Sequence, residues 1–180
     1  MESSNRNCDF QNSLKQIAFK TYFHNQVTTF GYDDLFAGRR VLVFSITHVM
    51  QSSVHFRNVN SHYQGLIDAG LDDVYCINSD NVLVGPWADK LSTTIKGLPD
   101  INKEFITALS VYTGSTLPIS MLSNFWQYMV IIDNGLIEHI WQTPLKSDIT
   151  WKLIKTNEYR YYGLDPVKIK KYLVDTTSNI

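Results

Sequence analysis

The sequence predicts an α/β domain with a central mixed sheet and helices on both faces. Three observations favour this class. A mainly apolar stretch at residues 40–46 is typical of a central strand covered on both faces. A helical pattern follows it, and a second apolar strand at 73–78 completes a strand–helix–strand unit with a parallel pair. An Asn134-Gly135 dipeptide between two further strand patterns predicts an antiparallel hairpin.

The N-terminal part of the chain is expected to contain a tail and a hairpin. Residues 1–15 predict a flexible tail, which leaves residues 16–180 as a single domain. β-Branched and aromatic residues over 17–30 predict two short paired strands. Residues 31–38 then predict a turn that leads into the first central strand.

The helix after that strand is expected to begin near Ser52 or Ser53, because either side chain can cap the free amides of a first turn. Gly70 is placed to end it. Its buried stripe follows one helical face and consists of Phe56, Val59, Tyr63, Leu66 and Ile67.

Beyond the second central strand, the pattern becomes shorter and less regular. Pro86 stands at the position that proline tolerates in the first turn of a helix. Residues 98–100 predict a turn, and a helix is expected from about 102 to 109. Residues 113–124 are rich in Gly, Ser, Thr and Pro and predict a long loop.

The last part of the chain supplies the hairpin and one more helix. Strands are expected at 127–132 and 137–141, and irregular structure at 143–162. The C-terminal helix is expected to start at Asp165-Pro166, and its apolar side consists of Val167, Ile169, Tyr172 and Leu173. This order of elements predicts a thioredoxin-like sandwich.

Composition excludes several classes of function. The net charge of −1 gives no electrostatic reason to expect nucleic acid or an anionic membrane surface as a partner. No apolar run approaches the roughly 18 residues of a membrane-spanning helix. The N-terminus lacks the apolar core of a secretory signal, so a cytoplasmic protein is expected. The two cysteines, Cys8 and Cys76, form no zinc-binding pattern, and we expect neither metal nor cofactor.

Several segments resemble the motifs of one family, and they occur in the family's order. Residues 34–44 resemble LFxGKKVVLF, 70–76 resemble GVDEVAC, and 125–135 resemble SWRYAMVVDDG. Weaker matches cover residues 80–87, 98–109 and 165–173. The chain therefore resembles a peroxiredoxin over about residues 30–175, in the branch of the human type-five and plant type-two enzymes. The resemblance implies a thioredoxin-like redoxin domain and a homodimer that forms around the active-site turn.

The family's reactive turn, PxxxTxxC, is altered here. In the family, a cysteine thiolate attacks peroxide with help from the helix N-terminus and an arginine. Alignment from the preceding strand puts that cysteine at Val54, and alignment from the following glycine puts it at Gln51. No cysteine occurs from residue 9 to 75, so the peroxidatic thiol is absent under either alignment. The family's arginine aligns with Gln127, so the electrostatic partner is absent as well.

Other groups near the turn offer weaker chemistry. Ser52 or Ser53 can act as an acyl-transfer nucleophile if His48 or His55 serves as its base, and no orienting acid is evident. The simpler interpretation is that both serines cap the helix. His48, His55 and His62 recur every seven residues, a helical rise of about 10 Å, so no single metal can be held by two of them. The resemblance also gives His55 a structural reading.

Three functions follow from these observations. The first is a protein that has lost thiol-peroxidase chemistry and binds or converts a small organic molecule in the altered pocket. The second is a non-catalytic interaction or dimerisation protein on the same scaffold. The third is a residual thiol peroxidase that uses Cys76 or Cys8. For the first function, the candidate catalytic residues are Thr47, His48, Gln51, Ser52 and Ser53, and the candidate binding residues are Met50, Trp87, Phe125, Trp126, Gln127 and Tyr128.

Overall fold

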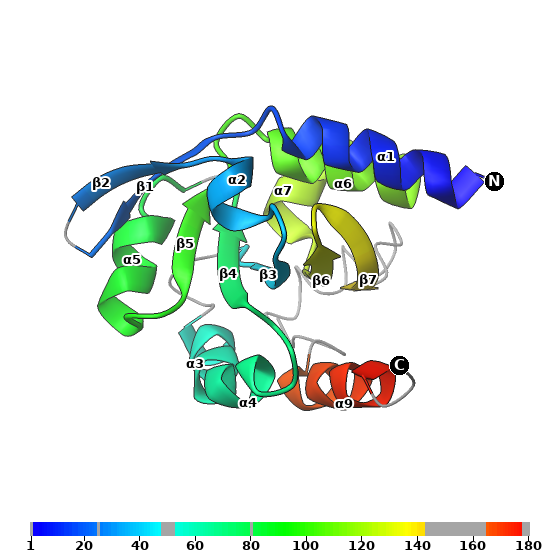
Figure 1. Cartoon of the computed structure of the whole chain (residues 1–180). Coiled ribbons are helices and arrows are strands. Elements are labelled where there is room, and N and C mark those ends of the chain that lie inside the picture. Colours follow the sequence, from blue (N-terminus) through cyan, green and yellow to red (C-terminus); the bar gives the residue numbers. More distant parts are fainter. Residues whose placement is uncertain (1, 25, 48–52, 80, 143–164, 178–180) are drawn as a thin grey trace, which may run out of the picture.

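The computed structural model describes residues 2–24, 26–47, 53–79, 81–142 and 165–177. A five-stranded sheet lies at its centre, in the order β5-β4-β3-β6-β7 (Figure 1). Its strands are β3 (Arg40–Ser45), β4 (Asp73–Asn78), β5 (Lys96–Pro99), β6 (Tyr128–Asp133) and β7 (Leu136–Gln142). The strands β1 (Phe19–Phe23) and β2 (Gln26–Phe30) form a separate antiparallel pair, as predicted.

Helices cover both faces of the sheet. They are α1 (Glu2–Leu14), α2 (Tyr32–Leu35), α3 (Ser53–Ser61), α4 (Tyr63–Ile67), α5 (Val84–Leu91), α6 (Glu104–Thr113), α7 (Ile119–Phe125) and α9 (Pro166–Thr177). Figure 1 shows α1 and α6 above the sheet and α3, α4 and α9 below it. None of the helices in the described ranges is long and apolar enough to cross a membrane. The predicted α/β class with helices on both faces is confirmed.

The sheet is mixed in the predicted way. β3 and β4 are parallel, with Val41 opposite Asp73. β6 is antiparallel to β3 and continues through a tight turn into β7. Asn134 and Gly135 in that turn have φ angles of 49° and 80°. The left-handed backbone explains why this dipeptide is a reliable hairpin signal.

Side-chain alternation divides the core into two clusters. Val41 and Val43 of β3 face the cluster under α1, α2, α6 and α7. Leu42 and Phe44 face the opposite cluster, which α3, α4, α5 and α9 cover. Because successive residues of a strand point to opposite faces, each central strand must be apolar on both sides. Because of this requirement, the apolar runs in the sequence correctly predicted β3 and β4 as central strands.

The N-terminal helix α1 is a correction to the flexible tail expected for residues 1–15. Phe10 and Leu14 are 2% and 0% exposed, and both belong to the core cluster. The Phe10 ring lies 6.0 Å from that of Phe105 and 6.2 Å from that of Tyr112, both on α6. Two apolar residues four positions apart are enough to anchor a helix whose other residues are polar. The polar composition concealed them.

Three further elements lie where no regular structure was predicted, and the first is α2, which covers Tyr32–Leu35 within the turn expected at residues 31–38. β5 occupies Lys96–Pro99, so it overlaps the first two residues of the turn expected at 98–100, and it pairs in parallel with β4. Pro99 is tolerated because β5 is an edge strand. α7 covers Ile119–Phe125 within the expected loop. The helix α6 begins at Glu104 and extends to Thr113, four residues beyond its predicted end.

The helix after β3 is divided into α3 and α4, with His62 between them. Three residues of the predicted stripe, Phe56, Val59 and Leu66, are fully buried, and the other two, Tyr63 and Ile67, are partly buried against the same cluster. Gly70 has a φ of 103°, which fits its predicted role at the end of this helical region.

The C-terminal helix α9 starts at the predicted proline, and Ile169 and Leu173 are buried against the sheet. Val167, which was expected on the apolar side, is 55% exposed. It lies in the first turn, two positions before Ile169, and a helix places residues two apart on different sides. Residues 143–162, predicted to be irregular, lie outside the described residues.

Candidate functional site

The polar side chains of interest gather where the parallel strands end. β3, β4 and β5 run parallel, so their carboxyl ends share one edge of the sheet. β6 runs the other way and therefore begins at that edge. Ligand sites of open α/β sheets lie outside this edge. The buried polar residues found there are Ser45, Thr47, Asn78, Ser79, Asp100 and Gln127.

Asn78 fixes the path of the chain as it leaves β3. Its side chain is 2% exposed, and its Nδ2 donates to the carbonyl oxygens of Ile46 and, at 3.4 Å, Thr47. The Ile46 amide donates to the Ile77 carbonyl at 2.8 Å. A buried amide bonded to two carbonyls of a neighbouring strand end resists displacement, because breaking these bonds leaves buried groups unsatisfied. Thr47, a predicted site residue, is thereby held in place.

Asp100 connects the ends of β4 and β5 to α6. One carboxylate oxygen accepts from the Phe105 amide at 3.0 Å. The other accepts from the Ile106 amide at 3.0 Å and from the Ser79 hydroxyl at 3.2 Å. Burial raises the pKa of the Asp100 carboxyl, although these donors stabilise its anion. With both oxygens occupied, Asp100 caps the start of α6 and is not positioned as an open general base.

Tyr128 starts β6 and is bonded to the end of β3. Its backbone N–H donates to the Ser45 hydroxyl oxygen at 2.9 Å. The side chain is 1% exposed, and burial, with a smaller contribution from the Asp100 charge, raises the pKa of the phenol well above its usual value. Tyr128 is therefore a neutral core residue at physiological pH.

The predicted aromatic wall is divided between the two faces of the sheet. The rings of Trp126 and Tyr128 have centroids 5.0 Å apart and belong to the cluster under α6. The Trp126 Nε1–H donates to the Gln142 side-chain oxygen at 3.1 Å. Trp87 of α5 lies in the opposite cluster, 4.9 Å from the Phe56 ring. The structure does not bring these tryptophans together, because the sheet separates them.

Gln127 lies on the face that carries α3. It stands two residues before Met129, which belongs to the α3 cluster, and residues two apart in an extended chain share a face. Gln127 is 6% exposed. The position that aligns with the family's arginine therefore holds a neutral, buried amide at the start of β6.

His55 lies on the same face and is 4% exposed. Its ring meets the Phe44 ring edge-on, with centroids 5.5 Å apart. Burial lowers the pKa of the imidazole to about 4, so the ring is neutral at pH 7. Packing against Phe44 favours the structural reading of His55. His62 is half-buried between α3 and α4, with one ring nitrogen 2.8 Å from the Asn58 carbonyl oxygen.

Part of the predicted site lies outside the described residues, namely His48, Met50, Gln51 and Ser52. Ser53 is the first residue of α3, and Phe125 is the last of α7. Their side chains also lie outside the described part of the chain.

The two cysteines lie in β4 and α1 and differ in exposure. Cys76 is in the middle of β4 and fully buried, and burial raises the pKa of its thiol far above the usual value. A thiol in this state is not a nucleophile. Cys8 is exposed on α1, which packs across α6. Within the described ranges, no three His, Cys, Asp or Glu side chains group as metal ligands.

Similar folds occur among solved structures. The reduced peroxiredoxin 3 of Vibrio vulnificus, crystallised with hydrogen peroxide, matches with a TM-score of 0.66 and 17% identity, over 89% of this chain and 95% of that chain. The chain has the fold of the peroxiredoxins. Peroxiredoxin 5 of Alvinella pompejana matches with a TM-score of 0.57 and 21% identity, over 78% and 92% of the two chains. The 1-Cys peroxiredoxin of Plasmodium falciparum matches with a TM-score of 0.53 and 18% identity, over 74% and 88%.

No family model and no curated protein sequence matches the chain. The solved structures nevertheless confirm, at the level of the fold, the peroxiredoxin likeness that the sequence motifs led us to expect. Sequence reasoning missed Ser45, Ser79, Asn78 and Asp100 as site neighbours. The available signal was their place, since each stands at or beside the carboxyl end of a strand in the parallel part of the sheet.

Proposed function

We propose that this chain is a peroxiredoxin-like protein that lacks thiol-peroxidase activity and uses the altered pocket at the carboxyl edge of the sheet to bind or convert a small organic molecule. One observation supports this proposal above the others. The edge carries buried neutral polar groups, Thr47, Asn78 and Gln127, while Cys76 is sealed inside β4. These groups support a polar binding site at this edge that works without a reactive thiol.

The chemistry of these groups indicates the kind of ligand. A hydroxyl and carboxamides offer both donors and acceptors without charge. Peroxide reduction needs a thiolate and a cation that stabilises it, and an amide supplies neither. A neutral molecule with carbonyl or hydroxyl groups matches the pocket better than an anion, because Gln127 has no positive charge to offset the cost of burying one.

A ligand screen tests this proposal. Small neutral polar compounds are added to the full chain in a thermal-shift assay, and hits are soaked into crystals. A true ligand raises the melting temperature further as its concentration increases above its Kd, because the stabilisation grows with the logarithm of that ratio. The shift is expected to be lost in Gln127→Leu and kept in Ser110→Ala, a matched change at a buried polar site on α6. The melting temperature of each variant without ligand is measured first.

Two results count against the proposal. One is that no compound stabilises the wild-type chain and no soaked crystal shows a ligand at this edge. The other is that Gln127→Leu keeps the full shift, which would put the ligand elsewhere.

A non-catalytic interaction protein is the second candidate, and exposed apolar residues favour it. Val54 in the first turn of α3 is 76% exposed, and Val82 and Leu83, between β4 and α5, are 61% and 60% exposed. Ile101, just after β5, is 42% exposed. All four follow the carboxyl ends of strands, so they border the candidate site and suit a homodimer around it. The cytoplasmic location stays a prediction.

Sedimentation separates the two candidates. An interface around the site predicts a dimer that Leu83→Lys dissociates, with no need for a ligand. A monomeric wild-type chain at high concentration would remove this second candidate.

A further inference from the structure

The fold presents three strands at the edges of its sheets. β5 and β7 end the five-stranded sheet, and β2 is the outer strand of the hairpin, whose β1 lies near β5. An edge strand displays backbone N–H and C=O groups that can pair with another chain, so proteins usually block such edges. The three edges differ in how they are blocked.

The edge at β7 is capped by a side chain from α1. The Asn7 amide nitrogen donates to the Ile137 carbonyl at 3.1 Å, and the Asn7 oxygen accepts from the Ile137 N–H at 2.9 Å. The amide of Asn7 thus takes the place that a neighbouring strand would take. β7 also has an irregular register against β6 and carries the charge of Glu138, both of which discourage pairing.

The edge at β5 is blocked in a related way. The buried hydroxyl of Thr21, on β1, donates to the Gly97 carbonyl at 2.5 Å. Pro99 has no N–H to offer, and Lys96 adds a charge. Side chains therefore satisfy or remove some of the pairing groups at both edges of the main sheet.

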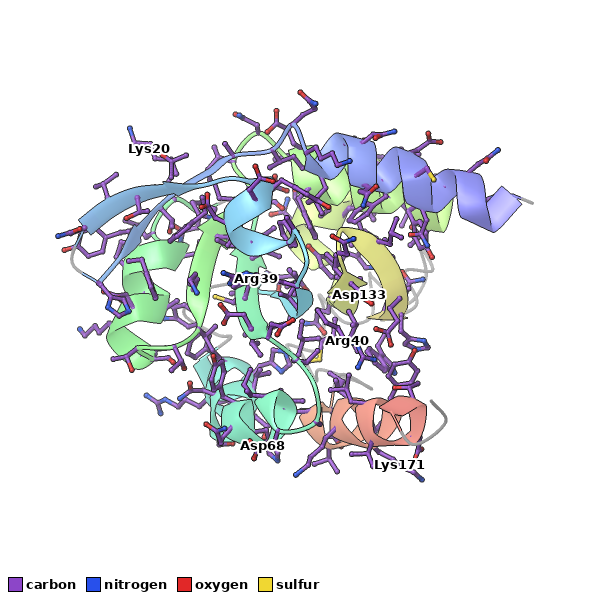
Figure 2. All side chains as sticks on the ribbon, viewed as in Figure 1. Lys20, Arg39, Arg40, Asp68, Asp133 and Lys171 are labelled. Atoms are coloured by element: carbon purple, nitrogen blue, oxygen red, sulfur yellow. The ribbon has the colours of Figure 1, made fainter. Side chains whose placement is uncertain are left out.

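The edge at β2 carries none of these devices. Its sequence, Gln26-Val27-Thr28-Thr29-Phe30, contains no charge and no proline. Val27 is 68% exposed, and Thr29 is exposed too. Among the described residues, β1 is its only strand partner, and no side chain hydrogen-bonds to its backbone. Figure 1 shows the hairpin at the periphery, and Figure 2 labels Lys20, which belongs to β1 and not to β2.

We propose that β2 is a self-association edge, which pairs antiparallel with β2 of a second copy of this chain to form the four-stranded ribbon β1-β2-β2-β1. A two-fold axis at Thr28 puts each Val27 opposite the partner's Thr29, and each Gln26 opposite the partner's Phe30. Residues near such an axis meet themselves or close neighbours, so a charged strand would repel its own copy. β2 is neutral throughout, and its β-branched residues favour an extended pair.

The test places charges on the exposed face of β2. In the double variant Val27→Lys/Thr29→Lys, residue 27 of each copy lies opposite residue 29 of the other, so each of these pairs brings two lysines together. In Val27→Glu/Thr29→Glu, every pair brings two glutamates together. Sedimentation equilibrium of the full chain is expected to show a concentration-dependent wild-type dimer, and a dissociation constant raised at least about fivefold in each variant. An equimolar mixture of the two variants should restore association, because every pair is then Lys opposite Glu.

Two controls distinguish the β2 edge from the other possible dimer interface, which is the group of exposed apolar residues around the candidate site. Val167→Lys changes an exposed valine of α9 and should leave the dimer intact. Amide hydrogen exchange should show β2 protected more strongly at high protein concentration in the wild-type chain only. The proposal is overturned if the wild-type chain is monomeric throughout, if both double variants dimerise like wild type, or if the mixture fails to associate. Loss of the dimer in Leu83→Lys, with β2 exchange unchanged, would overturn it and assign dimerisation to the candidate site.

Discussion

Arg40 of β3 and Glu138 of β7 form a two-pronged ion pair across β6, the strand that separates them. Arg40 Nε lies 2.7 Å from Glu138 Oε2, and Nη2 lies 2.5 Å from Oε1. The same Nη2 donates to the Thr176 hydroxyl on α9 at 3.3 Å. The pair therefore joins two strands of the sheet to the C-terminal helix. Figure 2 shows Arg40 between the sheet and α9.

Removing the charge of Glu138 tests what this pair contributes. Glu138→Gln is expected to lower the free energy of unfolding by about 1 kcal/mol, because the pair is bidentate and only partly exposed, with side chains 18% and 22% exposed. Hydrogen exchange should rise most in α9, the element that the pair anchors. Urea unfolding with exchange mass spectrometry measures both. An unchanged α9 would mean that Ile169 and Leu173 hold the helix without help from the ion pair.

Gly97 allows α5 to pack closely on β5. A Cβ at this position would lie 2.3 Å from the Val84 carbonyl oxygen and 2.9 Å from the Gly85 Cα, which are backbone atoms that cannot turn aside. Gly97→Ala is therefore expected to cost about 2 kcal/mol or more in urea unfolding, since α5 must move.

Gly65→Ala is the matched control for Gly97→Ala. Gly65 lies in α4, and its added Cβ would meet the flexible end of Lys170 at 3.1 Å. The lysine can move, and alanine favours a helix by about 0.5–1 kcal/mol over glycine. Gly65→Ala should leave stability unchanged or raise it. Equal losses in both variants would contradict the steric argument.

The parts of the fold that the sequence predicted correctly are those with a strong local pattern. Residues 41–44 and 74–77 are continuous apolar runs, and their burial on both faces leaves few alternatives. The Asn134-Gly135 turn was readable because its backbone demands such residues. By contrast, α1 is held by long-range contacts of Phe10 and Leu14, which no local pattern in a polar segment records. β5 is short and ends in a proline, so it carried no strand signal.

The candidate site was predictable only in part, for a different reason. Sequence order placed Thr47 and Gln127 at one edge, because it gave the directions of β3 and β6. It did not separate Trp87 from Trp126, since the face of each depends on the register and on which helix covers it. Asp100 lies in a predicted turn, so no pattern marked it as a site neighbour. Its carboxylate accepts hydrogen bonds from Ser79, which is distant in the sequence, and from Phe105 and Ile106 in the helix that follows.

The buried His55 is expected to make stability fall in mild acid. Its native pKa of about 4 lies below the ordinary value of 6.5, so the unfolded chain takes up a proton first as the pH falls. The native state should lose about 3 kcal/mol between pH 6.5 and 4 from this group, at about 1.4 kcal/mol for each pKa unit.

Denaturant unfolding at a series of pH values measures this effect. His55→Phe removes the titrating group and keeps a ring beside Phe44, so its stability should depend less on pH across that window. Its stability at pH 7.5, where the imidazole is neutral, serves as the internal reference for packing changes. Parallel pH profiles of wild type and variant would show that His55 does not carry the effect.

Peroxide consumption with a thiol reductant distinguishes the proposed loss of peroxidase activity from the residual-peroxidase alternative. The wild-type rate should be no better than that of free cysteine, because Cys76 is buried and its thiol pKa is raised. Cys76→Ala and Cys8→Ser should leave that rate unchanged.

Gln51→Cys alone should not restore full activity, since the amide of Gln127 cannot replace an arginine charge beside a thiolate. Adding Gln127→Arg should raise the rate above that of Gln51→Cys. Full peroxidase activity in Gln51→Cys alone, or loss of a fast wild-type rate in Cys76→Ala, would refute this reading of the site.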